Sequence, residues 1–152
     1  MASLSLEELG RLAEGSGDLV MESVLSETVL EAARYKAFCM KEAPGEVHDW
    51  FTYWLIAEHE GARGIGLIGS KGLPDRDGFV EVSYAVAQER RGRGYLKEAL
   101  TEFLDWLFEC EFCMGAELYI REENTASRRA AEACGFSCEG EYKGYLKYRY
   151  VF

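Results

Sequence analysis

The sequence lacks a long hydrophobic run. No apolar segment in its 152 residues approaches the roughly 20 residues that a membrane-spanning helix needs. The first segment, MASLSLEELGRLAEG, carries acidic residues and lacks the basic segment followed by an apolar one that is typical of a signal peptide. We therefore expect a cytoplasmic protein that does not act at a membrane.

Positive charge is also scarce. The chain has 17 basic and 27 acidic residues, and its formal net charge is −10. Affinity for nucleic acids depends largely on cationic contacts to phosphate, so this composition argues against general nucleic-acid binding. An acidic surface keeps a protein soluble and is also compatible with a basic substrate.

Histidine is nearly absent, and the two present, His48 and His59, lie in loops and make no metal site. The five cysteines are an odd number, which favours reduced core residues over a disulfide framework. The alternative is a zinc site formed by Cys110, Cys113, Cys134 and Cys138. However, the C-x-x-C pair lies late in an apolar helical pattern and lacks the glycine of a zinc knuckle. We expect no metal.

The chain contains no internal repeat and no low-complexity linker, and its length suits a single domain over residues 1–152. The first 45 residues are predicted to be helical. Ser5 and Glu8 match a capping box, and apolar residues recur at helical spacing over 26–41.

Three strands are predicted next, over 50–57, 64–70 and 79–86. A helix follows, with an apolar stripe formed by Leu96, Leu100, Phe103, Leu104, Leu107 and Met114. We then expect a buried strand over 117–120, a helix over 125–134 that ends at Gly135, and a final hairpin. This order predicts an α/β (α+β mixed) fold with a mostly antiparallel sheet and flanking helices.

Two glycine-rich segments suggest ligand sites. Gly64, Gly66 and Gly69 spell G-x-G-x-x-G, but no helix follows them, as a dinucleotide-binding motif requires. The simpler interpretation is a strand beside a crowded neighbour.

The segment RRGRGYLKEAL, residues 90–100, does follow a predicted strand and opens a predicted helix. Glycines let backbone N–H groups approach a ligand, and a helix N-terminus carries a partial positive charge. The nearby cations Arg90, Arg91, Arg93 and Lys97 also favour a bound anion. The alternative is a solvated basic turn. No G-K-[S/T] follows, so the segment is not a Walker loop.

The same segment resembles the pyrophosphate-binding signature Q/R-x-x-G-x-G/A of the GNAT superfamily of acyl-CoA-dependent N-acetyltransferases. Arg91 and Gly94 match its first two fixed positions, whereas Leu96 replaces the usual small residue. FVEVSYAV, GYLKEALTEFLDWLF and ENTASRRAAEACGF are similar to segments of the branch that acetylates ribosomal-protein N-termini. The resemblance covers about residues 50–140.

The resemblance implies that acetyl-CoA is the co-substrate and binds where strands 79–86 and 117–120 splay apart. It implies an acetyl-CoA-binding core over 79–136 and an acceptor side over 1–45. The cofactor-binding residues that it implies are Tyr84, Ala85, Val86, Ala87, Arg91, Gly92, Arg93, Gly94, Tyr95, Leu96, Asn124 and Ser127.

For catalysis, the resemblance implies direct attack of a neutral amine on the thioester. Glu81 is the candidate base, because it is a carboxylate in an otherwise apolar strand, where burial raises its pKa; the alternative is an exposed charge or ion-pair partner. Many members use a tyrosine acid where this chain has Ala131, and Ser127 is the candidate to hydrogen-bond the sulfur. Tyr142 and Tyr145 are further candidate donors.

Three functions remain open at this point. The chain acetylates a protein N-terminus, acetylates a small amine such as a polyamine, amino acid or antibiotic, or binds acyl-CoA without catalysis. The expected partner is therefore an amine acceptor, and the expected assembly is a monomer or a homodimer.

Overall fold

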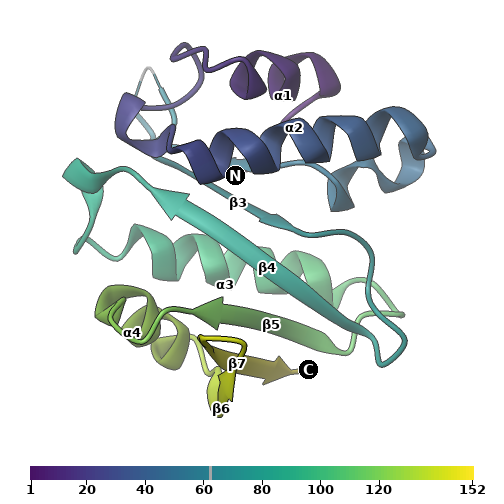
Figure 1. Ribbon diagram of the computed structural model, residues 1–152, viewed down its shortest axis with the longest axis vertical. Helices are drawn as coiled ribbons and strands as arrows, with labels where there is room; N and C mark the ends of the chain where they lie inside the picture. The colour runs from purple at the N-terminus through teal and green to yellow at the C-terminus, as the bar shows by residue number, and fades with distance from the viewer. Residues whose placement is uncertain (62) are drawn as a thin grey trace. The chain divides into compact units, whose positions relative to one another are not determined.

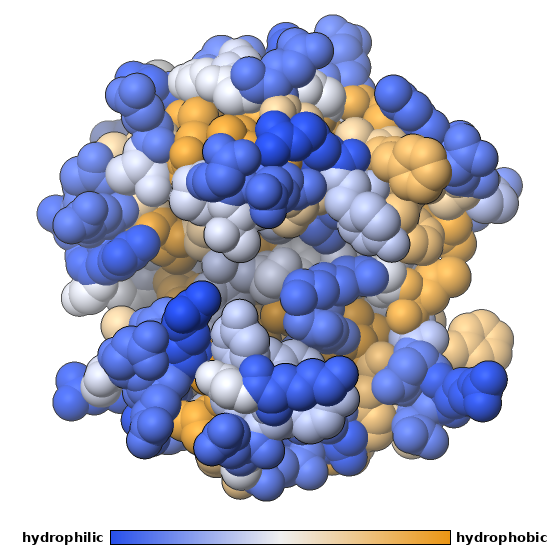
Figure 2. Space-filling model, in the orientation of Figure 1, coloured by the Kyte–Doolittle hydropathy of each residue, from blue (hydrophilic) through white to orange (hydrophobic). Residues whose placement is uncertain are grey.

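The computed structural model describes residues 1–61 and 63–152. Two compact units make up the chain: Met1–Leu73 with Ser83–Arg91, and Pro74–Val82 with Gly92–Phe152. Hydrophilic side chains cover most of the face drawn in Figure 2, as the net charge of −10 leads one to expect. None of the helices formed by the described residues is long and apolar enough to cross a membrane.

The first unit combines two helices with one side of the sheet (Figure 1). Its elements are β1 (Ala2–Ser3), α1 (Leu6–Ala13), η1 (Glu22–Val24), α2 (Glu27–Glu42), η2 (Gly45–Trp50), β2 (Trp54–Ile56), β3 (Gly66–Ser70), the last four residues of β4 (Phe79–Val86) and η3 (Gln88–Arg90). The three η elements are 3₁₀ turns.

The second unit contains the first four residues of β4 and all later helices and strands. These are α3 (Tyr95–Phe108), β5 (Gly115–Ile120), α4 (Thr125–Ala133), β6 (Ser137–Tyr142) and β7 (Tyr145–Val151). Strand β4 thus belongs to both units.

The sheet has seven strands in the order β1-β2-β3-β4-β5-β7-β6. Strands β4 and β5 are parallel, whereas the pairs β1–β2, β2–β3, β5–β7 and β6–β7 are antiparallel. This mixed α/β architecture, mostly antiparallel with flanking helices, confirms the predicted fold class.

Helix ends follow the local signals in the sequence. The Ser5 side chain accepts from the Glu8 N–H (3.2 Å), and the Glu8 carboxylate accepts from the Ser5 N–H (2.8 Å), which confirms the capping box. Ser26 caps α2 in the same way through the Val29 N–H (3.3 Å). After α4, Gly135 has φ +98°, the left-handed conformation expected at a helix C-terminus.

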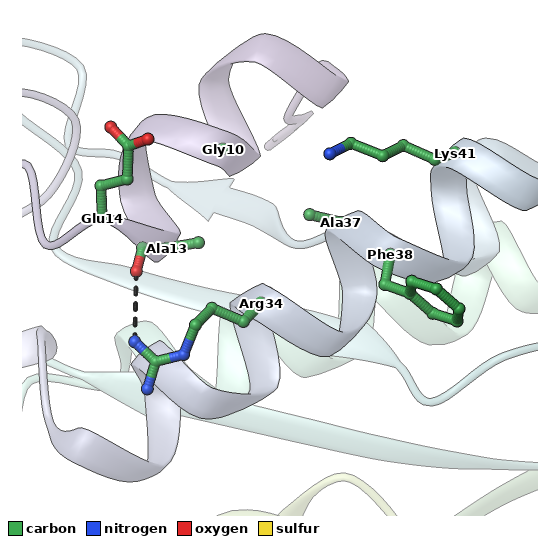
Figure 3. A pocket seen from close by; sticks show the side chains of 7 residues that line it. All are labelled: Gly10, Ala13, Glu14, Arg34, Ala37, Phe38 and Lys41. Carbon is green, nitrogen blue, oxygen red and sulfur yellow. Dashed lines mark hydrogen bonds between the residues drawn. The ribbon is translucent and has the colours of Figure 1, made fainter.

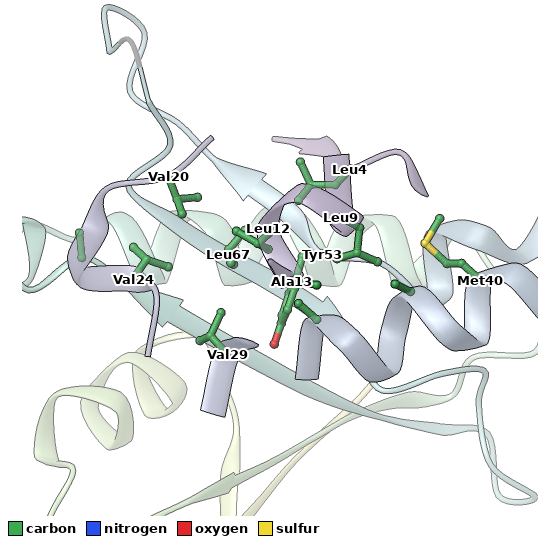
Figure 4. Packing of buried hydrophobic residues seen from close by; sticks show 13 residues of the cluster. Leu4, Leu9, Leu12, Ala13, Val20, Val24, Val29, Met40, Tyr53 and Leu67 are labelled. Carbon is green, nitrogen blue, oxygen red and sulfur yellow. The ribbon is translucent and has the colours of Figure 1, made fainter. Parts of the chain in front are cut away.

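The core of the first unit lies between α1, α2 and the strands (Figure 4). Apolar side chains of α1 and α2 face Leu67 of β3 and Tyr53, which immediately precedes β2. Burial of these groups, at roughly 25 cal/mol per Å² of apolar surface, stabilises the unit. The buried members of this core are Leu4, Leu9, Leu12, Ala13, Val20, Val24, Val29, Ala33, Ala37, Met40, Tyr53, Leu67 and Ala87.

The glycine-rich segment 64–70 forms a strand beside crowded neighbours, as the simpler interpretation predicted. A Cβ on Gly66 would lie 2.6 Å from the Ala85 carbonyl oxygen, and one on Gly69 would lie 2.6 Å from that of Thr52. Glycine is needed here because two backbones approach closely. The G-x-G-x-x-G pattern is therefore explained by packing.

The strand predicted over 50–57 was too long. The structure instead has the 3₁₀ turn η2 up to Trp50 and a strand of three residues, Trp54–Ile56. Side chains bind the backbone here: the Ser70 hydroxyl donates to the Trp50 carbonyl (2.9 Å), and the Trp54 indole donates to the Asp49 carbonyl (3.2 Å). The local bond from Trp54 and the bond from Ser70, which is 20 residues away from Trp50, favour a turn over the aromatic segment's strand propensity.

A lysine is buried inside the first unit. Lys36 on α2 is 5% exposed, its Nζ donates to the Ser70 carbonyl (2.5 Å), and it lies 4.9 Å from the centre of the Tyr53 ring. Burial lowers the pKa of Lys36 to about 8, and the charge of Lys71 acts in the same direction. The folded state thus releases this proton more readily than the unfolded chain does.

We expect this burial to be visible in the pH dependence of stability. Between pH 8 and the unfolded lysine pKa of about 10.4, the unfolded chain binds more protons, so folding becomes more favourable as the pH rises. We compare the free energy of unfolding of the unmodified chain with that of Lys36→Met. The difference should shift by about 3 kcal/mol in favour of the unmodified chain across this pH window and should be constant below it. Urea denaturation at several pH values measures the difference. A difference that is the same at pH 7 and pH 10 would contradict the expectation.

Candidate functional site

The segment between β4 and α3 starts from a well-anchored turn in the first unit. The Ala87 N–H donates to the Ile65 carbonyl (2.7 Å). The Ser23 hydroxyl donates to the Glu89 carboxylate (2.5 Å) and accepts from the Gln88 N–H (3.2 Å). The bond from Ser23 is the main cause of the lowered pKa of Glu89. The turn η3 is thereby fixed to η1.

Two arginines predicted to attract an anion have partners within the first unit. The Arg90 guanidinium pairs with the Glu58 carboxylate (3.1 Å), so much of its charge is compensated. The Arg91 Nε donates to the Val86 carbonyl (3.1 Å), which folds this side chain back along the end of β4. Arg91 therefore stabilises the turn, and its other guanidinium N–H groups are the ones that a ligand would use.

The glycines of the predicted phosphate loop open the longer segment of the second unit, Gly92–Phe152. Gly92 has φ +76°, and Gly94, the N-cap residue of α3, has φ +84°. No heavy atom lies within 4 Å of a Cβ placed on either glycine, so glycine is favoured here by the left-handed conformation and not by crowding.

The N-terminus of α3 is an electropositive, open helix end. Its N-cap residue is Gly94, which makes no side-chain hydrogen bond to the helix, and the N–H groups of a first helical turn lack acceptors within the helix itself. Arg93 and Lys97 are exposed beside it. Tyr95 and Leu96 are half-buried in its first turn. These features can bind an anionic group such as a phosphate.

Helix α4 carries the other predicted residues of the second unit. The Asn124 side chain caps it by accepting from the Ser127 N–H (3.2 Å), and Ser127 is buried. Ala131 is fully buried, and its methyl group cannot serve as an acid. The far end of α4 contacts the first turn of α3, because the Cys134 thiol donates to the Lys97 carbonyl (3.6 Å).

This contact sets the distance between the predicted residues at the start of α3 and the predicted residues Asn124 and Ser127. Ten residues separate Asn124 from Cys134, and a helix rises about 1.5 Å per residue, so they lie roughly 15 Å apart along α4. The start of α3 lies beside the Cys134 end, and Asn124 and Ser127 lie at the other end. A single ligand that contacted both groups would have to be long and extended.

The predicted residues at the end of β4 lie in the first unit. Val86 and Ala87 are buried, and Tyr84 and Ala85 are half-buried. The parallel ladder between β4 and β5 joins Phe79 to Gly115, Val80 to Ala116 and Glu81 to Glu117, and in the described chain it ends there. The later backbone of β4, which belongs to the first unit, therefore lies outside this ladder.

Glu81, the predicted base, is half-buried and pairs across the ladder with Glu117. Glu117 is 7% exposed and accepts from the Arg149 Nε (3.0 Å), the Lys147 ammonium (3.0 Å) and the Tyr119 hydroxyl (3.2 Å). The face of the sheet that bears Glu81 thus carries a buried ionic cluster.

Burial raises the pKa of Glu117, but the hydrogen bonds from Arg149 and Lys147 outweigh it, and the net effect is a lowered pKa. The pKa of Tyr119 is raised, first by burial and then by the charge of Glu117, so its phenol stays protonated at neutral pH. Sequence reasoning missed this cluster. A signal was present, because Glu117 is a charged residue inside the apolar segment GAELYI.

Tyr142 and Tyr145, the other candidate donors, lie at the turn of the β6–β7 hairpin and are exposed. The Tyr142 ring centre lies 5.7 Å from that of Tyr119. Arg121 lies 5.7 Å from the centre of the Tyr145 ring.

A groove between α1 and α2 holds none of the predicted site residues (Figure 3). Its volume is about 290 Å³, and it is lined by Gly10, Ala13, Glu14, Arg34, Ala37, Phe38 and Lys41. The Arg34 guanidinium donates to the Ala13 carbonyl (3.4 Å) and also pairs with Glu27 (3.1 Å), so this cation is already compensated.

The sequence placed the C-x-x-C pair on a packed helix, and this prediction was wrong. Helix α3 ends at Phe108, and Cys110 and Cys113 lie in the turn after it, where the Cys113 N–H donates to the Cys110 carbonyl (2.9 Å). The chain must turn here because the Met114 N–H donates to the Gly78 carbonyl (2.7 Å) and brings β5 alongside β4. Met114, predicted on the buried stripe, is therefore 51% exposed.

We expect metal analysis of the purified protein to find no stoichiometric zinc. Among residues 1–61 and 63–152, no three His, Cys, Asp or Glu side chains are grouped so that they could hold a metal ion. Atomic absorption after gel filtration tests this expectation. One zinc per chain that survives dialysis would show that the cysteines bind metal.

Comparison with known proteins identifies the family. The model of the acetyltransferase (GNAT) domain matches residues 4–137. The chain belongs to the GNAT acetyltransferase family. An uncharacterized N-acetyltransferase of Bacillus subtilis, YjdG, is 26% identical over 101 residues, which are 66% of this chain. The match spans 60% of the length of that curated relative.

Solved GNAT structures share the fold of this chain. A ribosomal-protein-S5-alanine acetyltransferase from Vibrio fischeri superposes with a TM-score of 0.74 at 16% identity, covering 98% of this chain and 90% of that one. A spermidine N-acetyltransferase chimera from Vibrio cholerae and hSSAT gives 0.68 at 18% identity, covering 98% and 92%. At these identities the likeness establishes the fold alone.

Proposed function

We propose that this GNAT chain is an acetyl-CoA-dependent N-acetyltransferase that transfers an acetyl group to a primary amine. The observation that carries the proposal is the N-terminus of α3. It is open, bears Arg93 and Lys97, and is preceded by two glycines in the left-handed conformation. A pyrophosphate fits these features because it is dianionic and accepts several hydrogen bonds.

The other predicted residues support an elongated cofactor. We assign the pyrophosphate to Arg91, Gly92, Arg93, Gly94, Tyr95 and Leu96. Along α4, Asn124 lies roughly 15 Å and Ser127 roughly 10 Å from the contact between α4 and α3, a spacing that suits the reactive end of a long pantetheine arm. We assign the backbone of Tyr84, Ala85, Val86 and Ala87 to hydrogen bonds with that arm.

The proposed reaction is a direct transfer. The amine must first lose a proton, because an alkylammonium has no lone pair, and Glu81 is the proposed acceptor of that proton. The amine nitrogen then bonds to the thioester carbon, and a backbone N–H near Val86 stabilises the oxyanion. The carbon–sulfur bond breaks, and the thiolate, held by Ser127, takes up the second proton, which the attacking nitrogen loses as the amide forms.

Two kinds of acceptor are supported. The V. fischeri structure is of a ribosomal-protein acetyltransferase, which favours a protein N-terminus. The V. cholerae chimera is a spermidine acetyltransferase, and the net charge of −10 would attract a polyamine. The test is release of coenzyme A thiol with a panel of N-terminal peptides, polyamines and amino acids.

The same assay separates the enzyme from a binding module. If acetyl-CoA binds in calorimetry and no amine in the panel releases thiol above the rate in water, the catalytic assignment fails and the cofactor assignment stands. If acetyl-CoA does not bind at all, both assignments fail.

A further inference from the structure

An apolar patch covers the C-terminal end of α3 in the second unit. We call it the α3-end patch, and it consists of Phe108, Phe112, Met114, Val151 and Phe152. The first four of these are exposed, with Phe108 at 67% and Phe112 at 80%. A hollow of about 260 Å³ is open within it and is lined by Leu104, Asp105, Phe108, Tyr150, Val151 and Phe152.

Contacts among Phe108, Met114 and Phe152, and with the neighbouring Tyr150, hold the patch in place. The Phe108 and Phe152 rings meet edge to face with centres 5.5 Å apart, and Phe152 meets Tyr150 in the same way at 5.6 Å. The Phe152 N–H donates to the Met114 carbonyl (3.0 Å). The hollow is thus preformed, and binding there would require little ordering of the protein.

Acidic residues flank the α3 side of the patch. Asp105 lines the hollow, Glu109 follows Phe108, and Glu111 precedes Phe112; all three are exposed. From Glu98 to Ile120 the sequence contains six acidic residues and no lysine or arginine. The patch therefore combines exposed aromatic surface with charge of one sign, a combination that marks an interaction site better than apolar surface alone does.

This charge decides what can bind. A second copy of the chain would bring two acidic rims together, and anionic lipid or nucleic acid would be repelled in the same way. A basic segment would instead place its cations on the carboxylates while an apolar side chain fills the hollow.

We propose that the α3-end patch docks a lysine- or arginine-rich segment of another protein through one aromatic or aliphatic side chain. This interaction is independent of acetyl transfer, because none of the residues assigned to the cofactor or to catalysis belongs to the patch.

The test uses a synthetic peptide in which a single phenylalanine is flanked by two lysines on each side, with both peptide ends blocked. Titration into the ¹⁵N-labelled protein should shift amide signals over residues 104–114 and 150–152. Phe108→Ser, which changes no charge, should weaken binding at least about tenfold, the loss typical of a central aromatic contact. Phe112→Ser provides a second variant at a more exposed position, where misfolding is not expected.

Matched controls separate docking from general attraction to an acidic protein. Phe38→Ser on α2 removes an aromatic side chain that is 62% exposed in the other unit, and it should leave the affinity unchanged. A peptide with serine in place of the phenylalanine should bind more weakly than the original.

Three results would overturn the proposal. Unchanged affinity in both Phe108→Ser and Phe112→Ser would mean that only charge attracts the peptide. Amide shifts confined to other residues would place the site elsewhere. Concentration-dependent dimerisation that Phe112→Ser abolishes would identify a second copy as the occupant.

Discussion

Gly94→Asp is expected to abolish acetyl-CoA binding. The new carboxylate would lie at the open N-terminus of α3, where it would repel the pyrophosphate. It would also accept hydrogen bonds from the backbone N–H groups that the pyrophosphate is proposed to use. Calorimetry should show at least a 100-fold loss of affinity, about 2.7 kcal/mol, because a negative charge is added at short range from the pyrophosphate.

The chain offers a close control for this substitution. Gly144, in the turn between β6 and β7, has the same φ of +84° and the same open surroundings as Gly94, but it is not part of the assigned site. Gly144→Asp should therefore share the backbone strain and keep the affinity. Gly94→Asp protein that folds and binds acetyl-CoA normally would refute the assignment of the phosphate site. Added salt should also weaken binding to the unmodified chain.

Glu81→Gln is expected to lower turnover by roughly 100-fold or more, the usual loss when a general base is removed. Glutamine keeps the size and hydrogen bonding of glutamate but cannot accept the ammonium proton. The affinity for acetyl-CoA should barely change, because no phosphate contact is altered. The loss should shrink at high pH, where more of the amine is already neutral.

Glu117→Gln distinguishes this catalytic effect from a general disturbance of the sheet face. Glu117 lies opposite Glu81 and holds Arg149 and Lys147, so its loss leaves two cations without their shared carboxylate and should lower the unfolding temperature. A Glu81→Gln enzyme that keeps normal turnover on its acceptor at neutral pH would show that Glu81 is structural. The same would follow if both substitutions changed stability and turnover to a similar extent.

Much of the fold could be predicted because its signals are local. The capping box at Ser5, the alternating pattern of β4 and the glycine after α4 each act over a few residues. Two predictions failed where distant contacts outweighed local propensity. In the aromatic segment 50–57 only Trp54–Ile56 form a strand, because Ser70 binds the backbone of Trp50 in the preceding 3₁₀ turn. Helix α3 stopped early because Met114 must reach Gly78.

The sequence alone determined the glycine–arginine segment before α3 and the asparagine before α4, because a loop conformation and a helix cap depend on residues next to each other. Only the tertiary structure decided that Arg90 pairs with Glu58 and that Arg91 folds back onto Val86. It also decided that Glu117 forms ion pairs with Lys147 and Arg149. Apart from Arg91 and Val86, these partners are about 30 residues apart in the chain. The energy of an ion pair depends on distance and burial, which sequence spacing does not encode.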